Sequence, residues 1–292
     1  MSQPVVLVTG ANGQVGQELR VLAASYPTFE FIFTSHDIMP VNDEAAVQKV
    51  FATHRPAYCI NCAAYTAVDK AESEQDIAYQ VNAEGTRILA AACKASNTRF
   101  IHISTDYVFN GQSPAPYTED VATDPVNTYG ASKLKGEQLC LQYNPETIII
   151  RTAWVYSSFG KNFVKTMMKL MQDRPAISVV SDQVGAPTYA ADLAKCMMDI
   201  VVNSELSSGS SWVPGIYHYS NQGRISWHEF AVAIKELIGS TCTVNPIPSE
   251  QYPTPAKRPA FSLLDTNKIR NTFHCTIPEW KESLKACLKL LS

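Results

Sequence analysis

Residues 6–19, VLVTGANGQVGQEL, decide the fold of this chain. An apolar run with the composition of a buried strand leads directly into three spaced glycines and then into a helical pattern. Glycine permits a tight turn and lets phosphates approach backbone N–H groups, and the helix N-terminus adds positive potential. Between a strand and a helix, this spacing predicts a dinucleotide-binding turn. Its expected cofactor contacts are Gly10, Asn12, Gly13, Gln14, Val15 and Gly16.

Strand-like and helix-like segments alternate outward from this turn. Alternation of this kind is typical of a parallel, doubly wound sheet. We therefore predict an α/β fold of Rossmann type, with a dinucleotide-binding domain over residues 1–155. The predicted strands cover residues 4–10, 29–35, 57–64, 99–105 and 146–156, and the predicted helices cover residues 14–25, 42–54, 73–96 and 128–143.

The pattern becomes less regular after about residue 155. The Pro-rich stretch at 247–262 excludes a central strand or a helix interior, while Ser226 and Glu229 have the spacing of a capping box. We expect residues 156–292 to form mainly a smaller α/β cap that binds substrate, with some segments returning to the main sheet. Its predicted elements are helices at 162–174, 226–239 and 277–291 and a strand at 215–220.

Composition restricts the partners of this 292-residue chain. A net charge of -3 supplies no basic surface for nucleic acid, and no apolar run approaches the ~20 residues of a membrane span. The N-terminus lacks the pattern of a signal peptide, so we expect a cytoplasmic protein with a small-molecule ligand. Cys59 and Cys62 form a C-x-x-C spacing at a strand end, which favours packing thiols over a redox pair.

The end of the second predicted strand bears on cofactor choice. In sheets of this kind that position contacts the adenosine ribose, with an acid for a 2′-hydroxyl or a basic group for a 2′-phosphate. Ser35 and His36 hold the expected contact positions and Asp37 follows them. Because no acid stands at the contact positions, the sequence favours NADPH, with NADH also accepted.

A tyrosine–lysine pair and a polar strand end supply the candidate chemistry. Tyr129 and Lys133 are four residues apart and share one face of a predicted helix, where an ammonium would stabilise the tyrosine phenolate. The same spacing also occurs in ordinary surface pairs, but its place after the fourth strand favours catalysis. Thr105 ends that strand within STDYVF, residues 104–109, and could donate a hydrogen bond to a reacting carbonyl or simply cap the strand.

Eight segments in order resemble the dTDP-4-dehydrorhamnose reductase family of extended short-chain dehydrogenases. These segments are TGANGQVG, NCAAYTAVDKAE, STDYVF, YGASKLKGE, RTAWVY, NFVKTM, DQVGAPT and YPTPAKRP. The glycine motif and Tyr-x-x-x-Lys occur throughout the superfamily, whereas TAVDKAE, STDYVF, RTAWVY and DQVGAPT are specific to this reductase. The resemblance implies NAD(P)H-dependent reduction of the 4-keto group of dTDP-4-dehydro-L-rhamnose to dTDP-L-rhamnose.

The resemblance also implies a role for individual residues. Tyr129 would protonate the alkoxide, Thr105 would orient the carbonyl, and Lys133 would hold the nicotinamide ribose and tune Tyr129. Further implied cofactor contacts are Ala63, Ala64, Tyr65 and Asn82. The implied substrate contacts are Thr105, Asp106, Tyr107, Trp154, Asn162, Gln183 and Arg258. Arg258 suits bidentate phosphate binding, and a core position is an equal alternative for Trp154.

Two departures from the family pattern qualify these expectations. Residues 40–42, Pro-Val-Asn, stand where members often carry Asp-hydrophobic-Thr near the adenine, so the adenine contacts are open. Some members form a dimer bridged by magnesium on glutamates. Glu18 matches one of those acids, but Ala191 and Leu290 occupy the other positions. We therefore predict no metal site, and a monomer or a homodimer.

Rival functions share parts of this pattern. A 4,6-dehydratase would need a second carboxylate where Tyr107 stands, and the reductase-specific segments speak against an epimerase. Another sugar-nucleotide 4-keto reductase could share every motif, because pocket shape reads the base and the stereochemistry. A non-catalytic, nucleotide-binding regulatory subunit of the same fold is the alternative from a different class, which the intact Thr105, Tyr129 and Lys133 disfavour.

Overall fold

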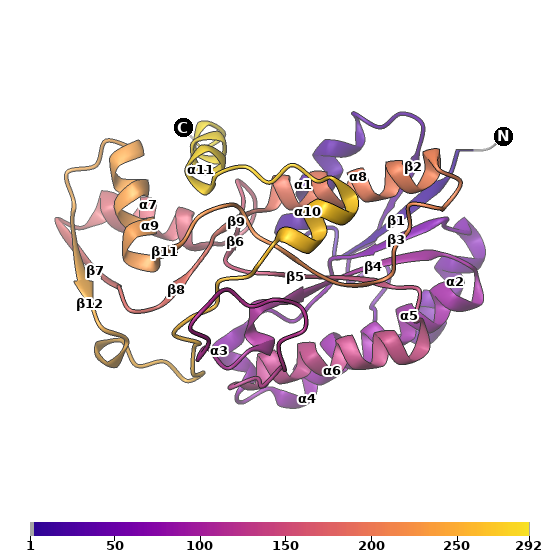
Figure 1. Cartoon of the computed structure of the whole chain (residues 1–292), viewed down its shortest axis with the longest axis horizontal. Coiled ribbons are helices and arrows are strands. Elements are labelled where there is room, and N and C mark those ends of the chain that lie inside the picture. Colours follow the sequence, from indigo (N-terminus) through magenta and orange to yellow (C-terminus); the bar gives the residue numbers. More distant parts are fainter. Residues whose placement is uncertain (1–2, 292) are drawn as a thin grey trace.

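A six-stranded parallel sheet forms the centre of the computed structural model, which describes residues 3–291 (Figure 1). Its order is β2-β1-β3-β4-β5-β10, so the chain leaves β1 toward one side and then continues on the other. Such a reversal opens a crevice at the carboxyl ends of β1 and β3. The predicted doubly wound α/β fold is confirmed. The strands are β1 (Val5–Thr9), β2 (Glu30–Phe33), β3 (Tyr58–Asn61), β4 (Arg99–Thr105), β5 (Ile148–Thr152) and β10 (Gly215–Tyr219).

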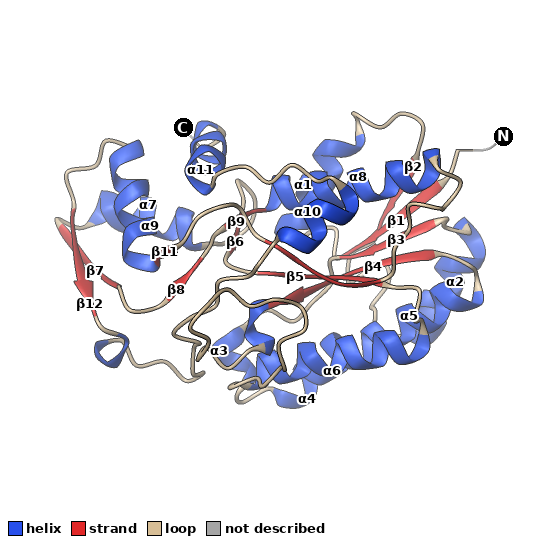
Figure 2. Cartoon of the chain, in the orientation of Figure 1, coloured by secondary structure: helices blue, strands red, loops and turns tan. Residues whose placement is uncertain are grey.

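Helices cover both faces of this sheet (Figure 2). In β1, Val6 and Val8 pack toward one helical layer, whereas Leu7 between them packs toward the other. Neighbouring side chains of a strand point to opposite faces, so a strand buried on both faces is apolar throughout. One layer comprises α1 (Gln14–Ala23), α8 (Ala190–Leu206) and α10 (Asn267–Phe273), and the other comprises α2 (Glu44–His54), α5 (Gly85–Ala95) and α6 (Thr128–Tyr143).

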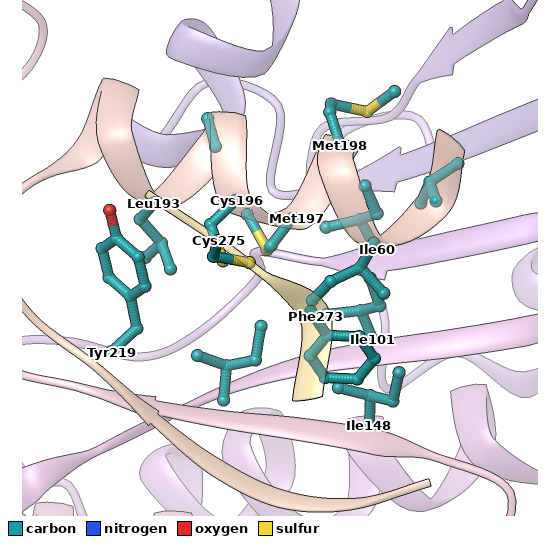
Figure 3. Close-up of a cluster of buried hydrophobic side chains, with 14 of the residues drawn as sticks. Ile60, Ile101, Ile148, Leu193, Cys196, Met197, Met198, Tyr219, Phe273 and Cys275 are labelled. Carbon is teal, nitrogen blue, oxygen red and sulfur yellow. The ribbon is translucent and has the colours of Figure 1, made fainter. Parts of the chain in front are cut away.

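The second half of the chain contributes to the central layers. Figure 3 shows Ile60, Ile101 and Ile148, from three neighbouring strands, in one buried cluster with Leu193 and Met197 of α8. Strand β10 extends the sheet by pairing with β5 in parallel. The second half of the chain thus contributes α8 and β10 to the central sheet and to the hydrophobic core on one of its faces.

A second hydrophobic cluster forms the core of the cap. The predicted capping box is confirmed, because the Ser226 side chain accepts from the Glu229 N–H and the Glu229 side chain accepts from the Ser226 N–H. The cap helices are α7 (Phe163–Asp173), α9 (Trp227–Leu237) and α11 (Trp280–Lys289). Its two-stranded sheets pair β7 (Ala176–Val180) with β12 (Thr243–Ile247), β8 (Val184–Gly185) with β11 (Ile225–Ser226), and β6 (Val155–Tyr156) with β9 (Thr188–Tyr189).

Two predicted elements differ in the structure. The strand expected over 146–156 is broken between β5 and β6, where Trp154 adopts a left-handed backbone conformation with φ of 49°. The helix expected over 73–96 is three consecutive pieces, α4 (Gln75–Tyr79), a π-helical turn (Gln80–Glu84) and α5. The three pieces follow one another without interruption, so a helix stands where it is expected. Hydrophobic periodicity registers neither the break after β5 nor the π-helical turn. Within residues 3–291, no helix is both long and apolar enough to cross a bilayer.

Candidate active site

A cleft of about 560 Å³ lies at the carboxyl ends of the central strands. The turn after β1, the loop after β3, the end of β4 and the start of α6 all contribute to its walls. The parallel topology alone therefore brings together motifs that are far apart in the sequence. Among the predicted site residues, the cleft is lined by Asn12, Gly13, Gln14, Val15, Ala63, Ala64, Thr105, Asp106, Tyr107, Tyr129, Lys133 and Trp154.

The glycine turn has the geometry that its spacing predicts. Gly10 has a φ of 62°, and a Cβ atom there would lie 2.6 Å from the backbone nitrogen of Ala63. A Cβ atom at Gly16 would lie 2.5 Å from the carbonyl oxygen of Gly10. Gly13 precedes α1 and supplies no side-chain cap, so the first N–H groups of α1 face the cleft without a side-chain acceptor. These features fit a pyrophosphate at the helix N-terminus.

The end of β4 places several polar atoms in the cleft. The Thr105 hydroxyl donates to Oδ1 of Asp106 at 3.0 Å and accepts from the Tyr107 N–H at 3.2 Å. The Ser104 hydroxyl and Oδ2 of Asp106 are buried without a hydrogen-bond partner. Burial raises the pKa of Asp106 to about 6. Unsatisfied polar atoms of this kind are expected where a polar ligand binds.

Tyr129 and Lys133 stand on one face of α6, beside the end of β4. The Tyr107 ring meets the Tyr129 ring edge to face, with centroids 5.6 Å apart. Burial raises the pKa of Tyr129 to about 12, opposed by a hydrogen bond with the Thr105 side chain. Burial also lowers the pKa of Lys133 to about 8. Tyr129 is therefore protonated at neutral pH, which differs from the phenolate-favouring effect expected from Lys133 and suits a proton donor.

A second pocket of about 410 Å³ lies in the cap and contains Gln183 and Arg258. Arg258 is already paired there, since its two terminal nitrogens donate to the two Asp69 carboxylate oxygens at 3.0 and 2.9 Å. Gln183 donates to the Ser249 hydroxyl at 3.0 Å. Trp227 lines both pockets and therefore marks their junction.

Other predicted site residues lie outside these two linings. Asn82 is buried, accepts from the Tyr65 N–H at 2.8 Å and donates to the Ser132 hydroxyl at 2.9 Å, so it ties the loop after β3 to α6. Asn162 caps α7 and donates to Gln14 Oε1 at 3.0 Å. The turn after β2 contains Ser35, His36 and Asp37, and the last two side chains are largely exposed.

Several lining residues were not predicted from the sequence. Trp227 stacks on Trp154 with ring centroids 3.7 Å apart, and nothing in its local pattern distinguishes it from a core aromatic. Ser104 could have been found, because it stands within the same polar strand end as Thr105. The other unpredicted lining residues of the cleft include Cys62, Thr66, Val68, Ile103, Thr152, Val155, Gly160 and Lys161.

Within residues 3–291, no group of three or more His, Cys, Asp or Glu side chains converges as metal ligands would. Glu18 is buried and accepts from the Ser157 hydroxyl at 2.5 Å, and burial raises its carboxyl pKa.

The eight cysteines are all free thiols, and Cys59 lies in the hydrophobic core. The fold and the cleft together fit an oxidoreductase that uses a nicotinamide dinucleotide.

Comparison with known proteins narrows this class. The family model described as RmlD substrate binding domain matches residues 4–292. A dTDP-4-dehydrorhamnose reductase of Aggregatibacter actinomycetemcomitans is 38% identical over 286 residues, which cover 96% of this chain and 97% of the relative. One of Sinorhizobium fredii is 40% identical over 282 residues, which cover 95% and 94%.

Solved structures agree with these relatives. A dTDP-4-dehydrorhamnose reductase of Clostridium acetobutylicum superposes with a TM-score of 0.92 at 40% identity, covering 98% of this chain and 99% of that one. One of Bacillus anthracis, in complex with NADP, superposes with a TM-score of 0.90 at 38% identity, with the same coverage. The chain belongs to the dTDP-4-dehydrorhamnose reductase family.

Proposed function

We propose that this protein reduces the 4-keto group of dTDP-4-dehydro-L-rhamnose to give dTDP-L-rhamnose, with NADPH as the preferred reductant and NADH also accepted. The observation that carries the proposal is the convergence of Thr105, Tyr129 and Lys133 beside the glycine turn in one cleft. Relatives that carry this activity in their names align over nearly the whole chain. The bound NADP of the Bacillus anthracis relative supports the choice of cofactor.

The chain's own residues divide the work of the reaction. Bound NADPH supplies the hydride. Tyr129, whose pKa burial holds near 12, gives its proton to the oxygen at carbon 4 as negative charge develops there. Thr105 stands beside Tyr129 and turns its hydroxyl from Asp106 toward that oxygen. Lys133, whose pKa lies near 8, holds a ribose hydroxyl and favours loss of the Tyr129 proton.

The remaining predicted contacts follow from the two pockets. We assign the cleft to the dinucleotide and the keto-sugar, and its walls come mainly from residues 1–155. We assign the cap, mainly residues 156–292, to the nucleotide of the substrate. Asp106, Tyr107 and Trp154 would contact the sugar, because they line the cleft beside Tyr129. Arg258 and Gln183 would contact the diphosphate and the nucleoside from the cap pocket.

The test follows absorbance of NADPH, and separately of NADH, with dTDP-4-keto-L-rhamnose generated in place. Tyr129→Phe is expected to lose at least about a hundredfold in kcat, the usual contribution of a general acid. Tyr143→Phe, at the exposed end of the same helix, is the matched control and should retain activity. A wild-type protein that binds NADPH but oxidises none with this substrate contradicts the proposal and favours another keto-sugar or a regulatory subunit.

A further inference from the structure

A buried chain of polar side chains runs from Lys133, which lines the cleft, to Thr9 at the end of β1. His102 lies within β4 and is fully buried. Its Nδ1 is 3.0 Å from Nδ2 of Asn61, and its Nε2 is 3.4 Å from Nζ of Lys133. Asn61 in turn accepts from the Thr9 hydroxyl at 2.5 Å. Since Thr9 and Asn61 are also buried, this chain ends inside the protein and offers no path to bulk water.

The hydrogen bonds of Asn61 determine the tautomer of His102. Oδ1 of Asn61 accepts from the Ala63 backbone N–H at 3.1 Å, and a backbone N–H can only donate. The other end of the amide, Nδ2, therefore faces His102 and can only donate. His102 Nδ1 must then accept, so the neutral ring carries its proton on Nε2. Burial lowers the pKa of His102 well below its ordinary value, which keeps the ring neutral.

An N–H group of His102 thus faces the Lys133 nitrogen. Lys133 Nζ also donates to the Ile103 carbonyl at 2.7 Å. An amine can donate to Ile103 and accept from His102, whereas an ammonium has only donors to present to the ring. The contact therefore favours the amine over the ammonium.

A second buried histidine shows the opposite arrangement. His218 Nδ1 is 3.0 Å from the Tyr117 carbonyl oxygen, which can only accept, so this nitrogen carries the proton. His218 Nε2 then presents a lone pair to the Arg151 guanidinium at 3.5 Å. One histidine thus offers its cationic neighbour an acceptor, and the other offers its cationic neighbour a donor.

We propose that His102 is a positioning residue of this reductase, with a tautomer fixed by Asn61 that places an N–H group against Lys133 and weakens its hold on a proton. The proposal rests on the proposed function, because it concerns the lysine of that site. It adds to the known chemistry a residue that touches neither cofactor nor substrate.

The other groups around Lys133 do not supply a free negative charge. Glu137, one turn along α6, is paired with Arg151 through hydrogen bonds of 2.9 and 2.6 Å. Burial raises the pKa of Cys140 to about 12 and raises that of Cys62 further, so both thiols are neutral. The desolvated Lys133, with a pKa near 8, is therefore sensitive to the single N–H group in front of it.

The first experiment measures both tautomers directly. Long-range ¹⁵N–¹H correlation spectra of the wild-type protein, assigned with His102→Gln and His218→Gln, should show Nε2–H on His102 and Nδ1–H on His218. The two rings serve as references for each other within one spectrum. A proton on Nδ1 of His102 overturns the proposal, whether or not the protein has turnover.

The second experiment follows the pH dependence of kcat/KM. Activity that requires the ammonium should fall as the pH rises through about 8 in the wild type. His102→Leu presents no donor to Lys133, so in this variant the alkaline limb should move upward by about one pH unit. In His102→Gln the side-chain oxygen accepts from Asn61 and the amino group still faces Lys133, so the limb should stay in place. His218→Gln should leave the limb in place. An unshifted limb in an active His102→Leu overturns the proposal, while a wild type without turnover contradicts only the proposed function.

Discussion

The two pockets that meet at Trp227 are built in different ways. Residues of the cleft stand at the ends of parallel strands and in the first turns of helices, where backbone hydrogen bonds fix their positions. Residues of the cap pocket stand on α7, β7 and the Pro-rich segment, where side-chain contacts such as Asp69–Arg258 set the geometry. Where backbone hydrogen bonds join neighbouring strands, the strand order tells which residues lie close together. Loop residues have no such ladder, so the strand order does not predict their neighbours.

The largest effect is expected at the buried ion pair behind the cleft. Glu137 and Arg151 are 2% and 3% exposed and form two hydrogen bonds. Glu137→Gln should lower the free energy of unfolding by about 3–5 kcal/mol, because it leaves a buried guanidinium without its charge partner. Glu236→Gln breaks the exposed pair with Lys281 in the cap and should change little. Urea unfolding measures both, and equal losses would contradict a difference between the two regions.

The next largest effect is a gain in stability, and it is expected from a substitution within the cleft. Burial raises the pKa of Asp106 to about 6, so the folded protein binds this proton more tightly than the unfolded chain does. The charged carboxylate therefore destabilises the fold above pH 6, and this cost disappears as the pH falls below about 4. Asp106→Asn should raise the unfolding free energy at pH 7.5 by on the order of 3 kcal/mol. Urea unfolding of the wild type and Asp106→Asn at pH 7.5 and at pH 4 checks this expectation. An equal gain in unfolding free energy at both pH values would contradict a raised pKa for Asp106.

The sequence predicted the cleft better than the cap for the same structural reason. Gly10 directly follows β1, Thr105 ends β4, and Tyr129 stands in the first turn of α6. They come together because the carboxyl ends of parallel strands meet at one edge of the sheet. Trp154 could not be placed, since its left-handed backbone breaks a segment that looks like one continuous strand. The pairing of Arg258 with Asp69 joins segments nearly two hundred residues apart, and no local pattern encodes it.

A smaller effect compares two glycines that share a positive φ. Gly10, in the turn after β1, and Gly239, after α9, have φ of 62° and 66°. Alanine at either position pays about 1–2 kcal/mol of backbone strain. At Gly10 the new Cβ also meets the backbone of Ala63, whereas at Gly239 nothing lies within 4 Å. Gly10→Ala should therefore lose about 2 kcal/mol more stability than Gly239→Ala and bind NADPH more weakly. Equal losses of unfolding free energy in the two variants, with NADPH affinity unchanged, would contradict this expectation. They would show that the backbone around Gly10 can shift to accommodate a Cβ atom.

The smallest effect on stability is expected at the ion pair between Asp69 and Arg258. Asp69 is 40% exposed and holds Arg258, which lines the cap pocket, in a bidentate pair. Asp69→Asn should cost less than about 1 kcal/mol, as exposed ion pairs do, yet raise KM for the sugar nucleotide several-fold with kcat little changed. The reason is that an unheld arginine must be ordered on binding. A lower KM would mean instead that the Asp69 carboxylate competes with the diphosphate for Arg258, so that the pair opposes substrate binding rather than prepares it.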